Sequence, residues 1–295
     1  MRGVVVDATV LLHATTRAAT TRGRVPALKP GQPRIMGILN VTPDSFSDGG
    51  RWLRPRDALR HAQRMAADGA DLIDVGGEST RPGARAVPLE EELARVIPVI
   101  RLLARRVSVP LSIDTSKAEV ARQALEAGAS LVNDVTALAG DPAMAAVVSR
   151  AGAPVILMHM RGSPRTMQRH PRYHNVIDEV KQALRGSITR AQHAGIPPRR
   201  ILLDPGLGFG KTATHNLLLL RHLDELATLG YPLVVGPSRK SFIGRLTGAA
   251  IHERLPGSLA SIAQAAQGGA SIVRVHDVKP ARQFLTVWRA IARCG

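Results

Sequence analysis

The sequence predicts a single α/β domain folded as a (β/α)8 TIM barrel, and three observations carry this prediction. Eight short apolar runs each end in a polar or ionisable residue. The runs recur about every 34 residues, near the length of one strand–helix–strand unit. The segments between them place apolar residues at helical spacing. A run that is apolar throughout suits a strand buried on both faces of a parallel sheet, and eight strand–helix repeats close a barrel.

The predicted strands are short and rich in valine, isoleucine and leucine, as fully buried strands are. In chain order they are residues 36–40, 71–78, 111–114, 131–134, 155–159, 201–204, 233–240 and 272–276. The polar residue closes each run at its carboxyl end, where α/β barrels carry their chemistry. One pattern therefore predicts both the fold and the place of the functional site.

The segments between the runs predict amphipathic helices. Leu59, Ala62 and Met65 fall on one helical face, and residues 93–103 and 176–188 repeat the pattern. Four glycines follow such segments, where helices commonly end in a left-handed residue: Gly69, Gly128, Gly195 and Gly230. The rival fold is a doubly wound open sheet, which usually begins with a glycine-rich dinucleotide loop. No such loop follows the first run, so the barrel is preferred.

The start of the chain precedes the strand–helix repeat. We expect residues 1–21 to form a flexible N-terminal extension and residues 22–295 to form the barrel. No apolar stretch reaches the roughly 18 residues that a membrane span needs, so we expect no membrane partner. The single cysteine, Cys294, has no partner for an internal disulfide, which fits a reducing, cytoplasmic compartment.

The net charge of +17 makes a nucleic-acid partner the first class to weigh. Arginine is scattered over the predicted helices, however, and aromatic residues make up only 3% of the chain. Proteins that bind single strands usually stack bases on aromatic side chains. We therefore expect no nucleic-acid partner, and a basic surface that helps to attract an anionic substrate.

Polar strand ends indicate a pocket for a flat heterocycle. A lone aspartate after a strand more often caps a helix. Asp74, Asp114, Asn133 and Asp204 all point to one mouth, where carboxylates and an amide can pair with amino and amide groups. Asn40 adds a neutral oxygen of the kind that a hydrated Mg²⁺ beside a phosphate accepts.

Cationic residues follow the last two strands. Phosphate sites in barrels are frequently built after strands seven and eight, at a helix N-terminus. Lys240, Arg274 and His276 occupy these positions, so we expect them to converge on an anion as cations. A zinc site is not expected, because HExxH and CxxC pairs are missing.

Three loops at the predicted mouth carry further candidates. The loop after the first strand holds Asp44, Phe46 and Asp48, which suits a mobile lid. In the second loop, Arg81 beside backbone N–H groups could hold an oxyanion. Residues 204–211 do not match the GxxxxGK[ST] phosphate loop, and their glycines instead allow close backbone approach to a flat ligand.

Taken together, these segments resemble the dihydropteroate synthases, folate-pathway enzymes that sulfonamides target. The resemblance covers about residues 22–290. It rests on MGILNVTPDSFSDGG (36–50), DVGGESTRPGA (74–84), SIDTSK (112–117), VNDV (132–135), LMHMRGSPRTMQ (157–168), LDPGLGFGKT (203–212), SRKSFIG (238–244) and RVHDV (274–278).

The resemblance implies a transferase that condenses 6-hydroxymethyl-7,8-dihydropterin diphosphate with 4-aminobenzoate, releasing diphosphate. It implies Mg²⁺ as the cofactor, a homodimer, and sulfonamides as inhibitors. Pterin binding falls to Asp74, Asp114, Asn133, Met158, Asp204 and Lys240. Diphosphate falls to Arg274 and His276, and the metal to Asn40. The aminobenzoate site comprises Phe46, Thr80, Arg81, Pro82, Gly208, Phe209 and Ser238. Catalysis is assigned to Asp44, Asp48, Arg81, Asp114 and Lys240.

Other functions stay open at this point. A pterin-binding methyltransferase barrel shares the carboxylate-lined pocket but handles no diphosphate, so it does not require the cations after strands seven and eight. A catalytically silent binding protein is motivated by the +17 charge alone. Within the resemblance, Phe46 and residues 80–82 look unmodified, which favours a sulfonamide-sensitive enzyme. The alternative is a drug-insensitive version that confers antibiotic resistance.

Overall fold

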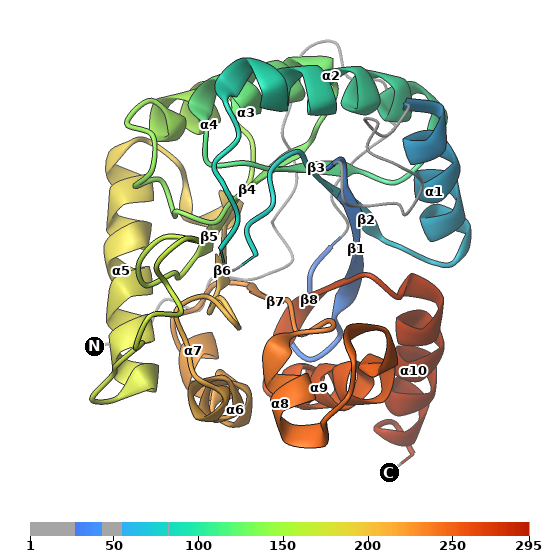
Figure 1. The fold of residues 1–295 in the computed structure, drawn as a ribbon, viewed down its shortest axis with the longest axis vertical. Coiled ribbons are helices and arrows are strands. Elements are labelled where there is room, and N and C mark those ends of the chain that lie inside the picture. Colours follow the sequence, from blue (N-terminus) through green and yellow to red (C-terminus); the bar gives the residue numbers. More distant parts are fainter. Residues whose placement is uncertain (1–26, 43–54, 82, 295) are drawn as a thin grey trace.

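The computed structural model describes residues 27–42, 55–81 and 83–294 (Figure 1). The expected extension over residues 1–21 lies outside the described residues. So do Asp44, Phe46 and Asp48 of the first loop, and Pro82 of the second. All other predicted site residues lie within the described ranges.

Eight parallel strands close into a barrel, which confirms the predicted fold. They are β1 (Arg34–Asn40), β2 (Leu72–Gly76), β3 (Leu111–Asp114), β4 (Leu131–Asp134), β5 (Val155–Met158), β6 (Ile201–Asp204), β7 (Leu233–Val235) and β8 (Ala270–Val275). Each strand pairs with the next in the chain, and β1 pairs with β8 to complete the ring. Four predicted runs extend past the carboxyl ends of their strands, because residues 77–78, His159, residues 236–240 and His276 leave the ladder and enter the loops at the mouth.

Helices surround the strands, as Figure 1 shows. They are α1 (Pro55–Ala67), α2 (Leu89–Arg106), α3 (Ala118–Ala127), α4 (Met144–Ala151), α5 (Val176–His193), α6 (Ala213–Arg221), α7 (Leu223–Ala227), α8 (Ser241–Thr247), α9 (Leu255–Gln267) and α10 (Val278–Ile291), with 3-10 turns η3 (Pro198–Arg200) and η4 (Ile251–Glu253). The predicted apolar faces lie against the barrel: Ala62, Met65, Val96 and Val180 are fully or almost fully buried. The four predicted helix-ending glycines all have positive φ.

The apolar core has two parts that meet at the strands. The larger part lies between the strands and the helices. The smaller part fills the barrel interior and comprises Leu28, Met36, Leu72, Leu131, Ile156, Leu202, Val234 and Ile272. These interior residues sit in the amino-terminal halves of their strands or precede them, so they form an apolar floor beneath the mouth. Among the described residues, no helix is long and apolar enough to cross a membrane.

Removing side-chain volume from this floor should destabilise the fold. Leu202 is 1% exposed, so Leu202→Ala leaves a cavity and should lower the free energy of unfolding by about 2–5 kcal/mol. Val287 on α10 is 56% exposed, and Val287→Ala should change it by less than about 0.5 kcal/mol. Urea unfolding of both variants measures the difference. Equal effects of the two substitutions would contradict the packed floor.

Candidate active site

The polar layer at the mouth follows from the two-residue period of a strand. Side chains two residues apart point to the same face. Leu72, Leu131 and Leu202 of the floor are therefore followed on the same face by Asp74, Asn133 and Asp204. Ile272 is followed in the same way by Arg274, and Ile156 by Met158. On β2, β4, β6 and β8 the interior thus changes from apolar to polar or charged within two residues, whereas on β5 it stays apolar.

Arg274 links two carboxylates across the barrel. Its Nε lies 2.6 Å from Asp74 Oδ2, and its Nη2 lies 2.7 Å from Asp114 Oδ2. Asn133 Nδ2 donates to the same Asp74 oxygen at 3.0 Å. These four residues come from strands β8, β2, β3 and β4, so only ring closure brings them together. We expected Arg274 to serve an anion as a free cation, whereas the structure offsets its charge with two carboxylates.

Two carboxylate oxygens in this cluster have no hydrogen-bond donor among the described residues. They are Asp74 Oδ1 and Asp114 Oδ1, and both are buried. A buried acceptor without a donor costs free energy unless a ligand or water supplies one. Burial raises the pKa of Asp114 to about 7; the Asp74 carboxylate adds to the shift and Arg274 opposes it. The cluster therefore presents acceptors for N–H groups of a ligand.

Asp204 and Lys240 form the adjoining wall. Asp204 Oδ1 accepts a hydrogen bond from the Gly206 N–H at 2.7 Å, and burial raises the pKa of this carboxyl. Desolvation lowers the pKa of Lys240 to about 8, while Asp204 opposes the shift. The Lys240 ammonium lies 4.3 Å from the centroid of the Phe209 ring, a cation–π contact. Met158, which pairs in register with Asp204, contributes buried apolar surface.

Gly208 lies directly beneath the Lys240 side chain. Its φ of +84° favours glycine, and a Cβ at this position would lie 3.1 Å from Lys240 Cδ, so the lysine side chain would have to shift by a few tenths of an ångström. The Gly208 N–H donates to Asn216 Oδ1 at 2.7 Å, and its carbonyl accepts from Gln168 Nε2 at 2.6 Å. Gln168 and Asn216 were not predicted as site residues, because neither stands at a strand end.

Ser238 and His276 join the loop after β7 to the end of β8. Ser238 Oγ accepts from the His276 N–H at 3.1 Å and lies 3.0 Å from His276 Nδ1. Burial, with Arg274 and Arg239 nearby, lowers the pKa of His276 to about 3. Its imidazole is therefore neutral near pH 7, which differs from the cation that we expected. A neutral ring can still donate a hydrogen bond to an anion.

The second loop is anchored by a lysine that the sequence analysis did not single out. Lys117 Nζ lies 2.5 Å from both Glu78 Oε2 and Glu92 Oε2, and Glu92 is fully buried. Thr80 and Arg81 follow Glu78 in this loop, and Arg81 is exposed. Arg81 is near enough to His276 to contribute to lowering its pKa.

Asn40 ends β1 and is half-buried. Within the described ranges, no group of three or more histidine, cysteine, aspartate or glutamate side chains is arranged to hold a metal ion. Any cation at Asn40 would therefore take its remaining ligands from water, substrate or residues outside those ranges. A neutral amide oxygen suits Mg²⁺, which commonly keeps several waters and binds phosphate oxygens.

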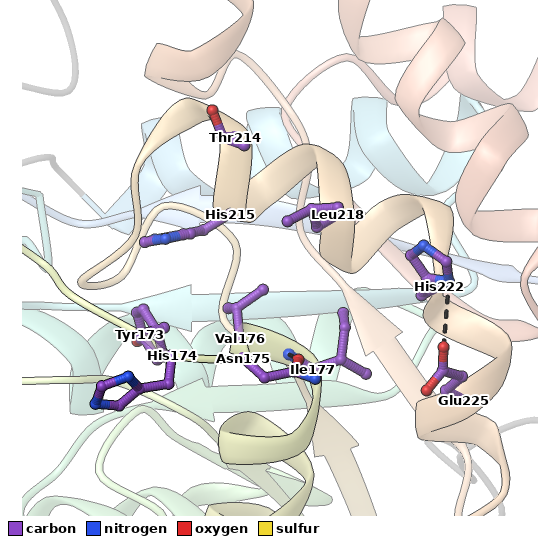
Figure 2. Close-up of a pocket in the computed structure, with 10 residues that line it drawn as sticks. All are labelled: Tyr173, His174, Asn175, Val176, Ile177, Thr214, His215, Leu218, His222 and Glu225. Carbon is purple, nitrogen blue, oxygen red and sulfur yellow. Dashed lines mark hydrogen bonds and ion pairs between the residues drawn. The ribbon is translucent and has the colours of Figure 1, made fainter.

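A second hollow of about 440 Å³ lies outside the barrel mouth, beside α5, α6 and α7 (Figure 2). Its wall includes Tyr173, His215, Leu218 and Glu225. It contains none of the predicted site residues. Tyr173 nevertheless links it to the mouth, because its hydroxyl donates to the Gly210 carbonyl at 3.0 Å.

The raised pKa of Asp114 predicts a pH-dependent stability. Its value of about 7 in the fold exceeds the ordinary 3.8, so the folded chain holds this proton more tightly than the unfolded chain. The free energy of unfolding should therefore fall as pH rises from about 4 to about 7. Asp114→Asn should remove that loss and be more stable than the wild type at pH 8, on the order of a few kcal/mol. Chemical denaturation at pH 4.5 and pH 8 tests this, and a difference independent of pH would contradict it.

The comparisons with known proteins agree with this geometry. Residues 36–276 match the family described as pterin binding enzyme. A dihydropteroate synthase of Synechocystis is 50% identical over 260 residues, covering 88% of this chain and 90% of the relative. The Yersinia pestis dihydropteroate synthase in a sulfonamide drug complex is 48% identical, with a TM-score of 0.85 and coverage of 88% and 94%.

Xanthomonas albilineans dihydropteroate synthase was solved with 4-aminobenzoic acid; it is 50% identical, with a TM-score of 0.84 and coverage of 90% and 94%. The same enzyme in complex with 7,8-dihydropteroate gives a TM-score of 0.81. The match spans the whole barrel, from the first strand to the end of the eighth. The chain therefore belongs to the pterin-binding enzymes and, within them, to the dihydropteroate synthase family.

Proposed function

We propose that this chain condenses 6-hydroxymethyl-7,8-dihydropterin diphosphate with 4-aminobenzoate to give 7,8-dihydropteroate and diphosphate. The observation that carries the proposal is the cluster of Asp74, Asp114, Asn133 and Arg274, in which two buried oxygens have no donor among the residues that the structure describes. A pterin ring offers N–H donors that match them. Relatives solved with 4-aminobenzoic acid and with 7,8-dihydropteroate support the choice of substrates.

Pterin recognition is assigned to the walls of this cluster. Asp114 and Asp204 accept from the ring's N–H groups, and Asn133 both donates and accepts. Lys240 donates to the ring's carbonyl oxygen, and Met158 packs against the ring face. Asp74 holds Arg274 and Asn133 through its Oδ2 and offers its Oδ1 to a ring N–H.

The reaction breaks the C–O bond between the pterin methylene and the diphosphate, and it forms a C–N bond to the aniline nitrogen. The bonding pair leaves with the diphosphate, and the nitrogen then loses a proton. Positive charge that develops on the pterin is stabilised by Asp114 and Asp204, which is electrostatic catalysis. No activated serine or cysteine is required, because the aniline nitrogen is already a nucleophile.

Diphosphate binding is assigned to Arg274 and His276. Ser238 Oγ accepts from the His276 backbone, so its own proton is available to Nδ1. This leaves the His276 Nε2 proton for a diphosphate oxygen. Asn40 supplies one oxygen to Mg²⁺, which when bound neutralises charge on the departing group. Asp44, Asp48 and Phe46 are assigned to a lid over this site, although they lie outside the described residues.

The aminobenzoate site is assigned to the loops that flank the pterin wall. Its members are Thr80, Arg81, Gly208, Phe209 and Ser238, together with Phe46 and Pro82. Sulfonamides resemble the aromatic amine and compete for this site, as the drug complex of the Yersinia pestis relative supports. The sensitive form is the version that we propose.

We further propose a cytoplasmic homodimer. Exposed apolar side chains on α6, α8 and η4 support a protein interface: Leu217, Leu246 and Ile251 are 41%, 57% and 49% exposed. Leu217 and Leu246 lie on α6 and α8, which pack against each other, and exposed apolar surface commonly marks such interfaces.

A single assay tests the proposed reaction. The wild type should release diphosphate and form dihydropteroate in equal amounts, and a sulfonamide should raise the apparent KM for 4-aminobenzoate. Asp204→Asn should lower kcat/KM by about 100-fold, because a charged partner of the pterin is lost. Tight binding of methyltetrahydrofolate without diphosphate release would favour the methyltransferase alternative instead.

The dimer is tested by charge substitution on its proposed surface. Leu246→Glu should shift the sedimentation coefficient from dimer to monomer, since an interfacial carboxylate is left unpaired. Val287 on α10 is equally exposed at 56%, and Val287→Glu should leave the dimer intact. A wild type that sediments as a monomer would contradict the assignment.

A further inference from the structure

Lys211 is the largest side chain that is almost fully buried in the described part of the chain, at 2% exposure. Its ammonium makes three short contacts: 2.9 Å to His159 Nδ1, 2.9 Å to the Gly206 carbonyl and 3.0 Å to the Phe209 carbonyl. The His159 carbonyl lies further away, at 3.4 Å. An ammonium has three N–H donors and no acceptor, so its capacity matches these three short contacts.

The tautomer of His159 decides whether its Nδ1 can accept a hydrogen bond from Lys211. Burial, with Lys211 and Arg161 nearby, lowers the pKa of His159 to about 3, so its ring is neutral near pH 7. A neutral ring that accepts at Nδ1 carries its proton on Nε2. All three short contacts of Lys211 are then acceptors, which favours its charged form. Burial lowers the pKa of Lys211 to about 7, Asp204 opposes this, and Lys240 and Arg161 add to it.

We propose that Lys211 is a positioning residue that holds the loop between β6 and α6 in the shape that presents Gly208 and Phe209 to the aromatic amine. This role rests on the proposed function, because it gives that loop its substrate. Lys211 itself is buried, and its short contacts go to His159 and to two loop carbonyls, not to the side chains that we assign to the pterin.

The backbone of this loop explains why it needs an internal cation. Gly206 and Gly210 have φ values of +66° and +65°. A Cβ on Gly206 would lie 2.0 Å from the His159 carbonyl oxygen, and one on Gly210 would lie 2.4 Å from the Arg161 carbonyl oxygen. The loop is therefore pressed against the segment after β5. The Gly206 and Phe209 carbonyls point inward, where Lys211 is the donor that both share.

Other contacts also hold the loop: the Gly206 N–H donates to Asp204 Oδ1 at 2.7 Å, and the Phe209 N–H donates to the Gly206 carbonyl at 3.1 Å. Tyr173 donates to the Gly210 carbonyl, and its ring carries the Arg161 guanidinium at 3.9 Å and the His215 ring edge-on at 4.9 Å. Tyr173 and His215 face each other in Figure 2. Gln168 and Asn216 hold Gly208. Without Lys211, the carbonyls of Gly206 and Phe209 would lose their shared donor, and the Phe209 ring would lose its fixed place beside Lys240.

The test separates positioning from general destabilisation. Lys211→Met keeps an unbranched side chain that is one atom shorter and removes its donors. It should raise the KM for 4-aminobenzoate by about 10-fold or more at saturating pterin diphosphate, because the aminobenzoate wall becomes mobile. The affinity for 6-hydroxymethylpterin, measured by calorimetry, should change by less than about 3-fold, since Asp74, Asp114 and Asn133 are untouched.

Two further variants guard against a simple folding defect. His159→Leu removes the acceptor and should repeat the KM effect, whereas His159→Asn places an amide oxygen near Nδ1 and should restore the KM. Arg282→Met is the stability control: Arg282 binds the Gly69 carbonyl and Asp71, away from the mouth, and its loss should leave both substrate constants unchanged.

The outcomes distinguish this inference from the proposed reaction. A wild type that condenses the two substrates, with an unchanged aminobenzoate KM in Lys211→Met, would overturn the positioning role alone. A wild type without synthase activity would overturn the reaction. In that case, hydrogen exchange of the Gly208 and Phe209 amides still tests whether Lys211 holds the loop. Faster exchange in Lys211→Met than in the wild type supports the positioning role, and unchanged exchange refutes it.

Discussion

Arg274 lies between Asp74 and Asp114 inside the barrel, and this shared ion pair sets the charge of the whole mouth. One guanidinium faces two carboxylates, so the cluster carries a net negative charge when both are ionised. Burying charges is unfavourable unless they are paired and hydrogen-bonded. Arg274 donates to one oxygen of each carboxylate, and Asn133 donates to the same Asp74 oxygen. The other oxygens, Asp74 Oδ1 and Asp114 Oδ1, are left for a ligand.

The apolar floor beneath this cluster makes the arrangement possible. Leu72, Leu131, Leu202 and Ile272 fill the interior and keep water from entering from below. In a site of low polarity, each hydrogen bond to a ligand is stronger than it is in water. The same desolvation explains the opposite pKa shifts in the mouth: Asp114 is raised, whereas Lys240 and His276 are lowered. Desolvation of the charged groups at the mouth therefore lowers the free energy of unfolding, and packing of the floor and the outer core offsets this loss.

The sequence predicted those features that follow from the spacing of apolar residues along the chain. It did not predict those that depend on contacts between distant residues. The strands, the buried helix faces and the helix-ending glycines followed from local pattern. Arg274 and His276 were correctly located at the end of β8, but the pairing of Arg274 and the neutral state of His276 were not foreseen. Asp74 and Asp114 offset Arg274, and burial keeps His276 neutral. Lys117 and Lys211 stood in recognised motifs but were given no role, because the contacts of a buried lysine in a loop have no sequence signature.

The sequence by itself determined the eight-fold repeat, the mouth at the carboxyl ends of the strands, and the set of polar residues there. It could do so because strand periodicity and chain order are local properties. Only the tertiary structure decided which of these groups pair with one another and in which direction burial shifts their pKa values. Asp74 and Arg274 stand 200 positions apart, yet closure of β1 against β8 puts them in contact. Contact distance and burial, which set pKa and pairing, arise only once the ring is closed.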